Sequence, residues 1–340
     1  MKKVFAKAPL RLGLAGGGTD LSPYWNQHGG IVLSGTIDQY AYCKVEPWDD
    51  WCFKSVDLGL EETIEYLKFI DYHDGPLKLL INSYIYLMRL HSHRTPVKIT
   101  TYVEAPPGSG LGSSSALVVA LVAAITEYYG IPKDEYEIAS DAWTIERVIC
   151  DLPGGKQDQY SAAFGGFNFI EFLQDGRTVV NPLRLNYKTQ NMLEINTVLY
   201  YVGSPRKDER VIEATSENLS SDNSKTIEAT HKIKDACIEF KRSLLVGDVK
   251  KISELMNQYW RFKLETSSKV GSPEILDTYE YSIKNGATAA KISGAGGGGH
   301  MILFTEFEER HKLITALKQR ETGRIVPFKF VKHGVDVWRS

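Results

Sequence analysis

Segments in which apolar and polar residues alternate fill the first part of the chain and predict β-strands. The clearest covers 97–103, where every second residue is Val, Ile or Thr, the spacing of a strand with one buried face. Further β-rich segments, at 4–8, 31–37 and 40–45, are separated by glycine-rich or polar turns. The chain therefore begins with strands of a sheet.

A buried helix is predicted directly after a glycine-rich loop. Residues 116–129 are apolar at nearly every position, Ser113 and Ser114 favour a helix N-cap, and Gly130 ends the pattern. The longest apolar run, 116–125, is shorter than the ~20 residues that a membrane-spanning helix requires. We therefore expect no membrane segment.

Helical periodicity replaces strand alternation in the second half of the chain. Before the change, a helix over 134–149 is followed by a hairpin that pairs 167–173 with 178–183. After it, a strand at 195–202 precedes several helices and a pair of strands. We place the helices near 208–219, 223–246, 248–266, 273–285 and 306–321, the strand pair at 287–293 and 300–304, and terminal strands after them.

The position of this change divides the chain into two domains. At 340 residues the chain is about twice as long as a typical domain. The first domain, 1–190, mixes strands and helices, and the second, 191–340, is mainly helical. The predicted fold class is therefore α+β, with a boundary within 184–194.

Charge and cysteine content exclude several classes of function. The chain has 40 Lys and Arg against 42 Asp and Glu, so it lacks the positive field that recruits nucleic acid or anionic membranes. Its 4 cysteines include no C-x-x-C pair, which argues against a zinc site or a disulfide framework. Lys7 and Arg11 interrupt the apolar stretch that a signal peptide needs. We expect a cytoplasmic protein.

The strongest chemical signal is the loop between the 97–103 strand and the buried helix. It reads Pro-Pro-Gly-Ser-Gly-Leu-Gly-Ser-Ser-Ser over 106–115. Alternate glycines let backbone N–H groups converge, and the positive end of the following helix favours an anion. A flexible, serine-capped turn is the alternative, but a cap does not need three glycines. We predict a phosphate-binding loop made of Pro107, Gly108, Ser109, Gly110, Leu111, Gly112, Ser113, Ser114 and Ser115.

This loop differs from the commonest nucleotide-binding motifs. A Walker A loop needs a lysine before its hydroxyl residue, and the 106–115 loop has none. The Rossmann fingerprint requires an early βαβ unit with an acidic ribose ligand, which we do not find, and protein-kinase signatures are missing. The loop therefore belongs to another phosphate-binding fold.

A second glycine-rich segment, 8–24, carries two charged residues. Arg11 stands on the predicted strand, and Asp20 follows a run of glycines that includes Gly17 and Gly18. An arginine supplies a planar cationic fork, and an aspartate beside bare backbone can accept hydrogen bonds from sugar hydroxyls. A tight turn with a surface ion pair is the equally supported alternative.

A third glycine-rich segment, 291–300, joins two predicted strands of the second domain. Glycines lose much conformational entropy on folding, so their accumulation indicates that a ligand or the phosphate-binding loop approaches the backbone here. A plain long turn is the alternative, and His300 is expected to begin a strand rather than to bind a ligand. The candidate residues are Gly294, Gly296, Gly297 and Gly298.

Two carboxylates, Glu146 and Asp158, stand on opposite sides of a Pro-Gly-Gly turn at 153–155. Such a turn lets one carboxylate face a metal ion and the other face a substrate. Taken alone, the spacing is more typical of solvated charges at helix ends.

The three glycine-rich segments resemble, in order and spacing, the three motifs of the superfamily of galactokinase, homoserine kinase, mevalonate kinase and phosphomevalonate kinase, the GHMP kinases. They are 8–24, 106–116 and 291–300, so the resemblance covers nearly the whole chain. It implies an N-terminal domain like the second domain of ribosomal protein S5, a ferredoxin-like C-terminal domain, and an active site in the cleft between them.

The resemblance also implies an ATP-dependent kinase that uses Mg²⁺. The phosphates of ATP would lie on the 106–115 loop. By match to the family motifs, Ser114 and Glu146 would bind the metal, an oxygen pair that suits Mg²⁺. Asp158 would face the acceptor hydroxyl as its base or positioning group, and Arg11 would orient Asp158 and steady the transferring phosphoryl group.

Within the superfamily, the sequence resembles sugar kinases. Arg11 is typical of them, whereas the Gly-Glu-His-Thr-Asp of galactokinases is replaced by Gly-Gly-Gly-Thr-Asp at 16–20, which argues against galactose. The segments 8–11, 15–20, 35–40 and 154–158 are most similar to those of bacterial D-glycero-D-manno-heptose 7-phosphate kinases. This implies transfer to the anomeric O1 of heptose 7-phosphate, giving heptose 1,7-bisphosphate on the way to GDP-heptose and surface polysaccharides.

A phosphorylated acceptor needs a cationic pocket, for which Lys156 and Arg206 are candidates, with ordinary surface charge as the alternative. Two other functions stay open: another sugar 1-kinase, of the fucokinase or galactokinase type, and a non-catalytic binding protein on the same fold. The expected partner is a small sugar phosphate, and a homodimer is left open. The full set of candidate acceptor contacts is Arg11, Gly17, Gly18, Asp20, Lys156, Asp158 and Arg206.

Overall fold

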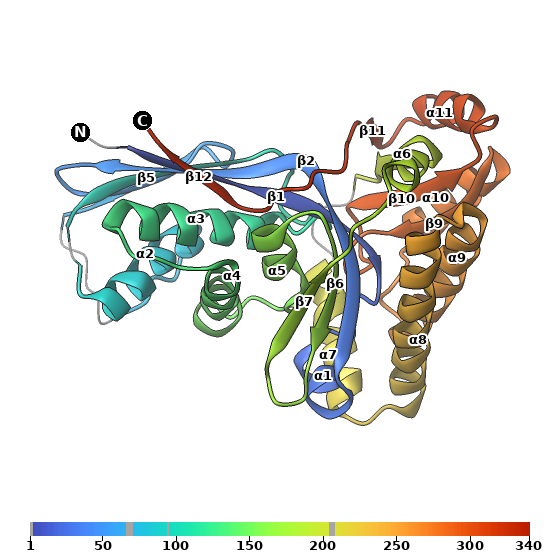
Figure 1. The fold of residues 1–340 in the computed structure, drawn as a ribbon, viewed down its shortest axis with the longest axis horizontal. Helices are drawn as coiled ribbons and strands as arrows, with labels where there is room; N and C mark the ends of the chain where they lie inside the picture. The colour runs from blue at the N-terminus through green and yellow to red at the C-terminus, as the bar shows by residue number, and fades with distance from the viewer. Residues whose placement is uncertain (1–2, 66–70, 94, 204–207) are drawn as a thin grey trace.

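A large, mostly antiparallel sheet, in which only β3 and β5 of the described strands pair in parallel, forms the frame of the N-terminal half (Figure 1). The computed structural model describes residues 3–65, 71–93, 95–203 and 208–340. Within them, eight strands follow the order β12-β1-β2-β5-β3-β4, with β6 paired to β2 and β7 to β6. The strands are β1 (Val4–Ala15), β2 (Gly30–Pro47), β3 (Trp51–Ser55), β4 (Leu60–Ile64), β5 (Val97–Val103), β6 (Phe167–Phe172), β7 (Thr178–Pro182) and β12 (Asp336–Arg339).

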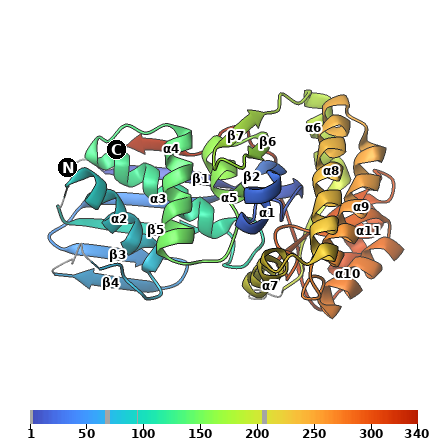
Figure 2. The same ribbon diagram turned by 90° about the horizontal axis from the view of Figure 1, so that it is seen from below.

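Four helices lie across one face of this sheet, as Figures 1 and 2 show. They are α2 (Lys78–His91), α3 (Ser113–Tyr129), α4 (Glu135–Trp143) and α5 (Gln157–Phe164). The central one is α3, in which every residue over 118–126 is buried, so the predicted buried helix is confirmed. Its N-cap, however, is Gly112 in a left-handed conformation, and the expected serine cap is wrong because Ser114 and Ser115 bind Glu146 instead.

The segment between α3 and the β6–β7 hairpin differs from the single helix expected over 134–149. Helix α4 starts with a capping box. The Asp134 side chain accepts a hydrogen bond from the Glu137 backbone N–H, and the Glu137 side chain accepts one from the Asp134 backbone N–H. It then widens into a π-helical turn, η1 (Thr144–Ile149). A π-helical turn often marks a functional site, and this one carries Glu146. Helices α2 and α5 were not predicted.

The C-terminal half contains a second antiparallel sheet, whose described strands follow the order β11-β8-β10-β9. Its strands are β8 (Thr197–Tyr201), β9 (Ala287–Ile292), β10 (His300–Thr305) and β11 (Arg324–Val326). Helices α6 (Tyr187–Asn196), α7 (Asp208–Ser220), α8 (Ser224–Val246), α9 (Val249–Thr266), α10 (Pro273–Lys284) and α11 (Arg310–Lys318) complete it. The strand expected at 195–202 begins later, because residues 195–196 finish α6, whose N-terminus is capped by Asn186.

The two halves share a core and exchange elements. Helix α8 packs against β1 and β2, and α7 lies beside α1 (Ser22–His28) in both views (Figures 1 and 2). The division at 190 is incomplete at the C-terminus, because β12 pairs with β1 and thus belongs to the first sheet rather than to the 191–340 unit. Among the described residues, no helix is long and apolar enough to cross a membrane.

Candidate active site

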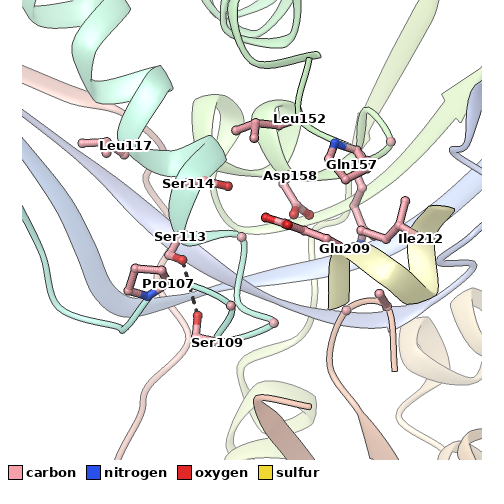
Figure 3. A pocket seen from close by; sticks show the side chains of 18 of the residues that line it. Pro107, Ser109, Ser113, Ser114, Leu117, Leu152, Gln157, Asp158, Glu209 and Ile212 are labelled. Atoms are coloured by element: carbon pink, nitrogen blue, oxygen red, sulfur yellow. Dashed lines mark hydrogen bonds between the residues drawn. The ribbon is translucent and has the colours of Figure 1, made fainter. Parts of the chain in front are cut away.

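A cavity of about 390 Å³ brings all three glycine-rich segments together. Gly17 and Gly18 line it from the loop after β1, the 107–114 segment lines it from the start of α3, and Gly294 lines it from the loop between β9 and β10. Gln157 and Asp158 enter from α5, and Glu209 and Ile212 enter from α7, as Figure 3 shows. The tertiary structure therefore assembles one site from segments that are far apart in the chain.

The loop at 106–112 adopts a conformation that only its glycines allow without strain. Gly108, Gly110 and Gly112 have φ angles of 72°, 73° and 75°, the left-handed region that side chains disfavour. The loop ends at the N-terminus of α3, where unpaired N–H groups and the helix dipole favour an anion. Leu111 and Ser115, also predicted to bind phosphate, are fully buried instead and lie outside the cavity lining.

The third glycine-rich segment packs against the 106–112 loop. A Cβ atom on Gly110 would come within 2.3 Å of the Ser293 carbonyl oxygen, and one on Gly299 within 2.3 Å of the Ser109 carbonyl oxygen. The His300 backbone N–H donates to the same Ser109 oxygen at 3.0 Å. The close approach expected at this segment is therefore its contact with the phosphate-binding loop. Of the four candidate glycines, Gly296, Gly297 and Gly298 lie outside the cavity lining.

His300 has a buried, neutral imidazole that holds the phosphate-binding loop. Its Nδ1 lies 2.7 Å from the Ser109 carbonyl oxygen, an acceptor, so Nδ1 carries the proton and donates it. Burial lowers the pKa of His300 to about 4, because a charged imidazole would lose its hydration. The residue is structural, as the sequence indicated.

Arg11 and Asp158 form an ion pair beside the start of α3. The Nε and Nη2 atoms of Arg11 both lie 2.6 Å from Asp158 Oδ1, and its Nη1 donates to the Gly110 carbonyl oxygen at 2.6 Å. Asp158 Oδ2 would lie 3.2 Å from a Cβ atom on Gly112. Arg11 therefore orients one carboxylate oxygen and leaves the other beside the anion-binding end of the helix.

Asp20 is held by backbone rather than by a basic side chain. Its Oδ1 accepts from the Gly18 N–H at 3.0 Å and its Oδ2 from the Gln157 N–H at 3.2 Å. A Cβ atom on Gly155 would collide with the Asp20 carboxylate, so the Pro-Gly-Gly turn is shaped to admit it. Asp20 thus joins the loop after β1 to α5 on the cavity wall.

Glu146 lies directly behind Ser114. The Ser114 hydroxyl donates to Oε1 at 2.7 Å, while Ser115 and Gln159 each donate to Oε2 at 2.6 Å. The guanidinium of Arg147 lies 3.4 Å from Oε1. Glu146 is fully buried and only Ser114 of this pair reaches the cavity wall. The π-helical turn explains this placement, since the wider turn directs Glu146 toward α3.

Two predicted acceptor contacts have a different outcome. The ammonium of Lys156 lies 4.0 Å from the ring centre of Trp25 and donates to the Gly176 carbonyl oxygen at 3.2 Å. Lys156 is not among the residues that line the cavity, so its position gives the expected acceptor contact no support, and burial lowers its pKa. Arg206 lies outside the residues that the structure describes.

Sequence reasoning missed the apolar end of the cavity. Side chains of α2, α3, β5 and the turn between β3 and β4 line it beside the 106–112 loop, among them Leu58, Leu79, Leu80, Val103 and Leu117. These residues belong to no common motif, and α2 was not predicted, so no sequence signal united them. An apolar slot beside a phosphate-binding loop suits a flat nucleobase.

The matches to family models identify the class of protein. Residues 78–166 match the N-terminal domain of GHMP kinases and residues 239–322 match the GHMP kinase C-terminal domain. The galactokinase of Lactococcus lactis, at 17% identity, has the same fold with a TM-score of 0.77, covering 98% of this chain and 95% of that one. This chain belongs to the GHMP kinases and is an ATP-dependent phosphotransferase that acts on an alcohol group.

Two relatives are similar along the entire chain. A protein of Campylobacter jejuni named D-glycero-alpha-D-manno-heptose 7-phosphate kinase is 38% identical over 342 residues, covering 100% of both chains. A crystal structure of a D-glycero-D-manno-heptose 1-phosphate kinase from Bacteroides thetaiotaomicron has a TM-score of 0.83 at 35% identity, covering 98% of each chain. The resemblance to sugar kinases extends over both domains.

Proposed function

We propose that this chain transfers the γ-phosphoryl group of ATP to the anomeric hydroxyl of D-glycero-D-manno-heptose 7-phosphate. The product, heptose 1,7-bisphosphate, leads toward GDP-heptose for surface polysaccharides. The full-length similarity to a heptose 7-phosphate kinase supports the acceptor. The observation that carries the reaction is the Asp158 carboxylate, fixed by Arg11 at 2.6 Å next to the anion-binding start of α3.

The cavity suits the two substrates at opposite ends. The apolar end, with Leu79, Leu80 and Val103, would take the base of ATP, and the 106–112 loop would take its phosphates. The acceptor would lie against Asp20, Asp158 and the glycines of the loop after β1. Each substrate would then contact segments that the other does not, and the anomeric oxygen would meet the γ-phosphorus near Gly112.

Asp158 performs the protein's part of the transfer step. Its free oxygen accepts or orients the proton of the anomeric hydroxyl while that oxygen attacks the γ-phosphorus and ADP departs with the bonding electrons. Arg11 keeps the carboxylate aligned and adds positive charge near the transferred group. Phosphoryl transfer depends mainly on positioning and charge neutralisation. Asp158 therefore serves mainly to position the acceptor hydroxyl, and Arg11 to align Asp158 and supply positive charge.

We place Mg²⁺ at Ser114 on the cavity wall and at Glu146, which lies directly behind it. Ser114 Oγ and Glu146 Oε1 are 2.7 Å apart, and neighbouring oxygens around a six-coordinate Mg²⁺ with bonds of about 2.1 Å lie roughly 3 Å apart. These two residues would hold the ion that neutralises the phosphates of ATP. The ion would supply charge neutralisation, and Arg147, 3.4 Å from Glu146, balances the buried carboxylate.

A cytoplasmic location is part of the proposal. Cys43, Cys52, Cys150 and Cys237 are all buried free thiols, which is in keeping with a reducing compartment. A kinase that consumes ATP also requires the compartment that supplies it.

Release of ADP, measured with Mg·ATP and a panel of acceptors, tests the proposed function. The panel contains heptose 7-phosphate, mannose, fucose, galactose and mevalonate, and phosphorus NMR of the product locates the new phosphate. We expect turnover of heptose 7-phosphate with phosphorylation at C1. Turnover of a free sugar alone would favour a sugar 1-kinase of the fucokinase or galactokinase type, and no turnover with any acceptor would favour a binding protein.

A further inference from the structure

A buried lysine of the second domain, Lys263, lines the acceptor end of the cavity. It lies on α9, near its C-terminal end, on the face of the helix that also buries Tyr259, Trp260 and Thr266. Lysine is rarely buried, because its ammonium loses hydration. Its presence on a buried face that opens into the cavity indicates that its charge serves the site.

The loop after β1 passes close to this ammonium on the cavity wall. Lys263 Nζ lies 3.4 Å from the Gly17 carbonyl oxygen, and a Cβ atom on Gly18 would come within 3.2 Å of Nζ. Gly18 has a φ of 106°, so side chains are disfavoured at this position and the approach to Lys263 stays open. The same two glycines line the cavity.

The cationic side chains of the cavity wall have different tasks. Among the described residues, Arg11, Arg147 and Lys263 line the cavity. Arg11 is paired with Asp158, and Arg147 donates to the carbonyl oxygens of the 152–155 turn. Lys263 comes from the other domain and stands beside the loop after β1, where its Nζ lies 3.4 Å from the Gly17 carbonyl oxygen.

Lys263 lies close to two other cationic side chains, Arg11 and Lys291. Burial, together with the positive charges of Arg11 and Lys263, lowers the pKa of Lys291 to about 7. The carboxylate of Asp20 on this wall is directed to the N–H groups of Gly18 and Gln157. Asp158 is paired with Arg11, and Glu209 is exposed on α7.

We propose that Lys263 binds the acceptor's own phosphate and thereby selects a phosphorylated sugar over the free sugar. This inference rests on the proposed function, because it assumes an acceptor phosphorylated at the end opposite to its reacting hydroxyl. The sugar would then bridge the domains, with its reacting hydroxyl at Asp158 on α5 and its phosphate at Lys263 on α9. An ammonium–phosphate contact is a charge-assisted hydrogen bond, among the strongest that a side chain forms.

The test compares kcat/KM for heptose 7-phosphate and for the unphosphorylated heptose in each variant. Lys263→Met and Lys263→Gln should reduce the preference for the phosphorylated acceptor by about 10- to 100-fold, mainly through KM, while the rate with free heptose changes by less than about threefold. Lys263→Arg, which keeps the charge, should retain most of the preference. Binding of heptose 7-phosphate without ATP, measured by calorimetry, should weaken by a similar factor.

Lys156→Met is the matched control, because Lys156 is another buried lysine close to the site in sequence but is not among the residues that line the cavity. It should keep the preference of the unaltered enzyme. Lys263 variants that also keep it would overturn the inference while leaving the proposed function intact. If the unaltered enzyme does not phosphorylate heptose 7-phosphate at all, the proposed function itself is wrong. Failure of the proposed function is therefore distinguishable from failure of the role assigned to Lys263.

Discussion

Arg11 contacts a single oxygen of Asp158 with two nitrogens, Nε and Nη2, each at 2.6 Å. Residue 11 belongs to the first strand of the sheet and residue 158 to α5, and the side chain of Arg11 is only 5% exposed while that of Asp158 is 20% exposed. The buried Arg11 therefore holds Asp158 in place, while part of the Asp158 carboxylate stays accessible from the cavity. This geometry leads to the first two predictions.

Replacement of Asp158 should remove catalysis without removing ATP binding. Asp158→Asn keeps the size of the side chain but loses the charge that aligns with Arg11 and the capacity to take a proton, so kcat should fall by about 10²- to 10⁴-fold. The measurement is coupled ADP release together with ATP calorimetry. Asp175→Asn, which breaks an exposed pair with Arg177, is the control and should leave both unchanged. Near-normal turnover of Asp158→Asn would show that the assignment is wrong.

Arg11→Lys should lower kcat even though the positive charge remains. A lysine cannot reach Asp158 and the Gly110 carbonyl oxygen with separate, fixed donors as the guanidinium does. We expect kcat to fall on the order of 10- to 100-fold, with a small change in KM for ATP. The comparison of steady-state kinetics with Arg11→Ala separates charge from geometry. If the lysine variant has full activity, charge alone suffices.

Glu146→Gln should increase the Mg²⁺ concentration needed for activity. The neutral amide offers a weaker ligand beside Ser114, and part of the hydrogen-bond network around Oε2 must reverse, since Gln159 and Ser115 both donate there. A titration of activity with Mg²⁺ at fixed ATP should shift to higher concentration by about tenfold or more. A thermal melt controls for folding. An unchanged metal titration in a folded variant would remove Glu146 from the metal site.

Gly299→Ala should destabilise the fold more than Gly59→Ala does. Both glycines have positive φ angles, 79° and 65°, so both variants carry a similar backbone cost. At Gly299 the new Cβ atom would also lie 2.3 Å from the Ser109 carbonyl oxygen, whereas at Gly59 it would meet nothing within 4 Å. The extra loss of unfolding free energy should be about 1–3 kcal/mol, measured by urea unfolding, and KM for ATP should rise in Gly299→Ala only. Equal losses would mean that the contact between the two loops is dispensable.

Stability should fall as the pH drops from about 6.5 to about 4, in part because of His300. An unfolded His300 takes up a proton near its usual pKa of 6.5, whereas the folded residue, with a pKa of about 4, resists protonation until lower pH. The unfolded state thus binds more protons in this window, so stability is complete above it and is lost as the pH falls through it. The loss attributable to His300 is at most roughly 3 kcal/mol.

The corresponding measurement is urea unfolding at several pH values for the unaltered protein and for His300→Gln. The variant cannot titrate at this position and should show a shallower loss between pH 6.5 and pH 4. Parallel curves for the two proteins would contradict the role assigned to His300.

Much of this molecule could be predicted from the sequence because its signals are local. The apolar run over 116–129 specifies a buried helix in any context, and the β6–β7 hairpin follows from two short strands joined by a tight turn. Glycines of the 106–112 loop are needed for its left-handed φ angles, so the motif and its conformation are inseparable. The family and its chemistry followed from such local segments.

Only the tertiary structure decided which side chains face the cavity. Lys156 stands two residues from Asp158, yet it turns toward Trp25, while Lys263, more than a hundred residues away, lines the site. Likewise, β12 leaves the C-terminal half to pair with β1. Sequence spacing determines local conformation, but the direction of a side chain and the pairing of distant strands depend on packing against elements far along the chain. That packing places Lys263 at the acceptor end of the cavity, and no sequence motif that we identified includes this residue.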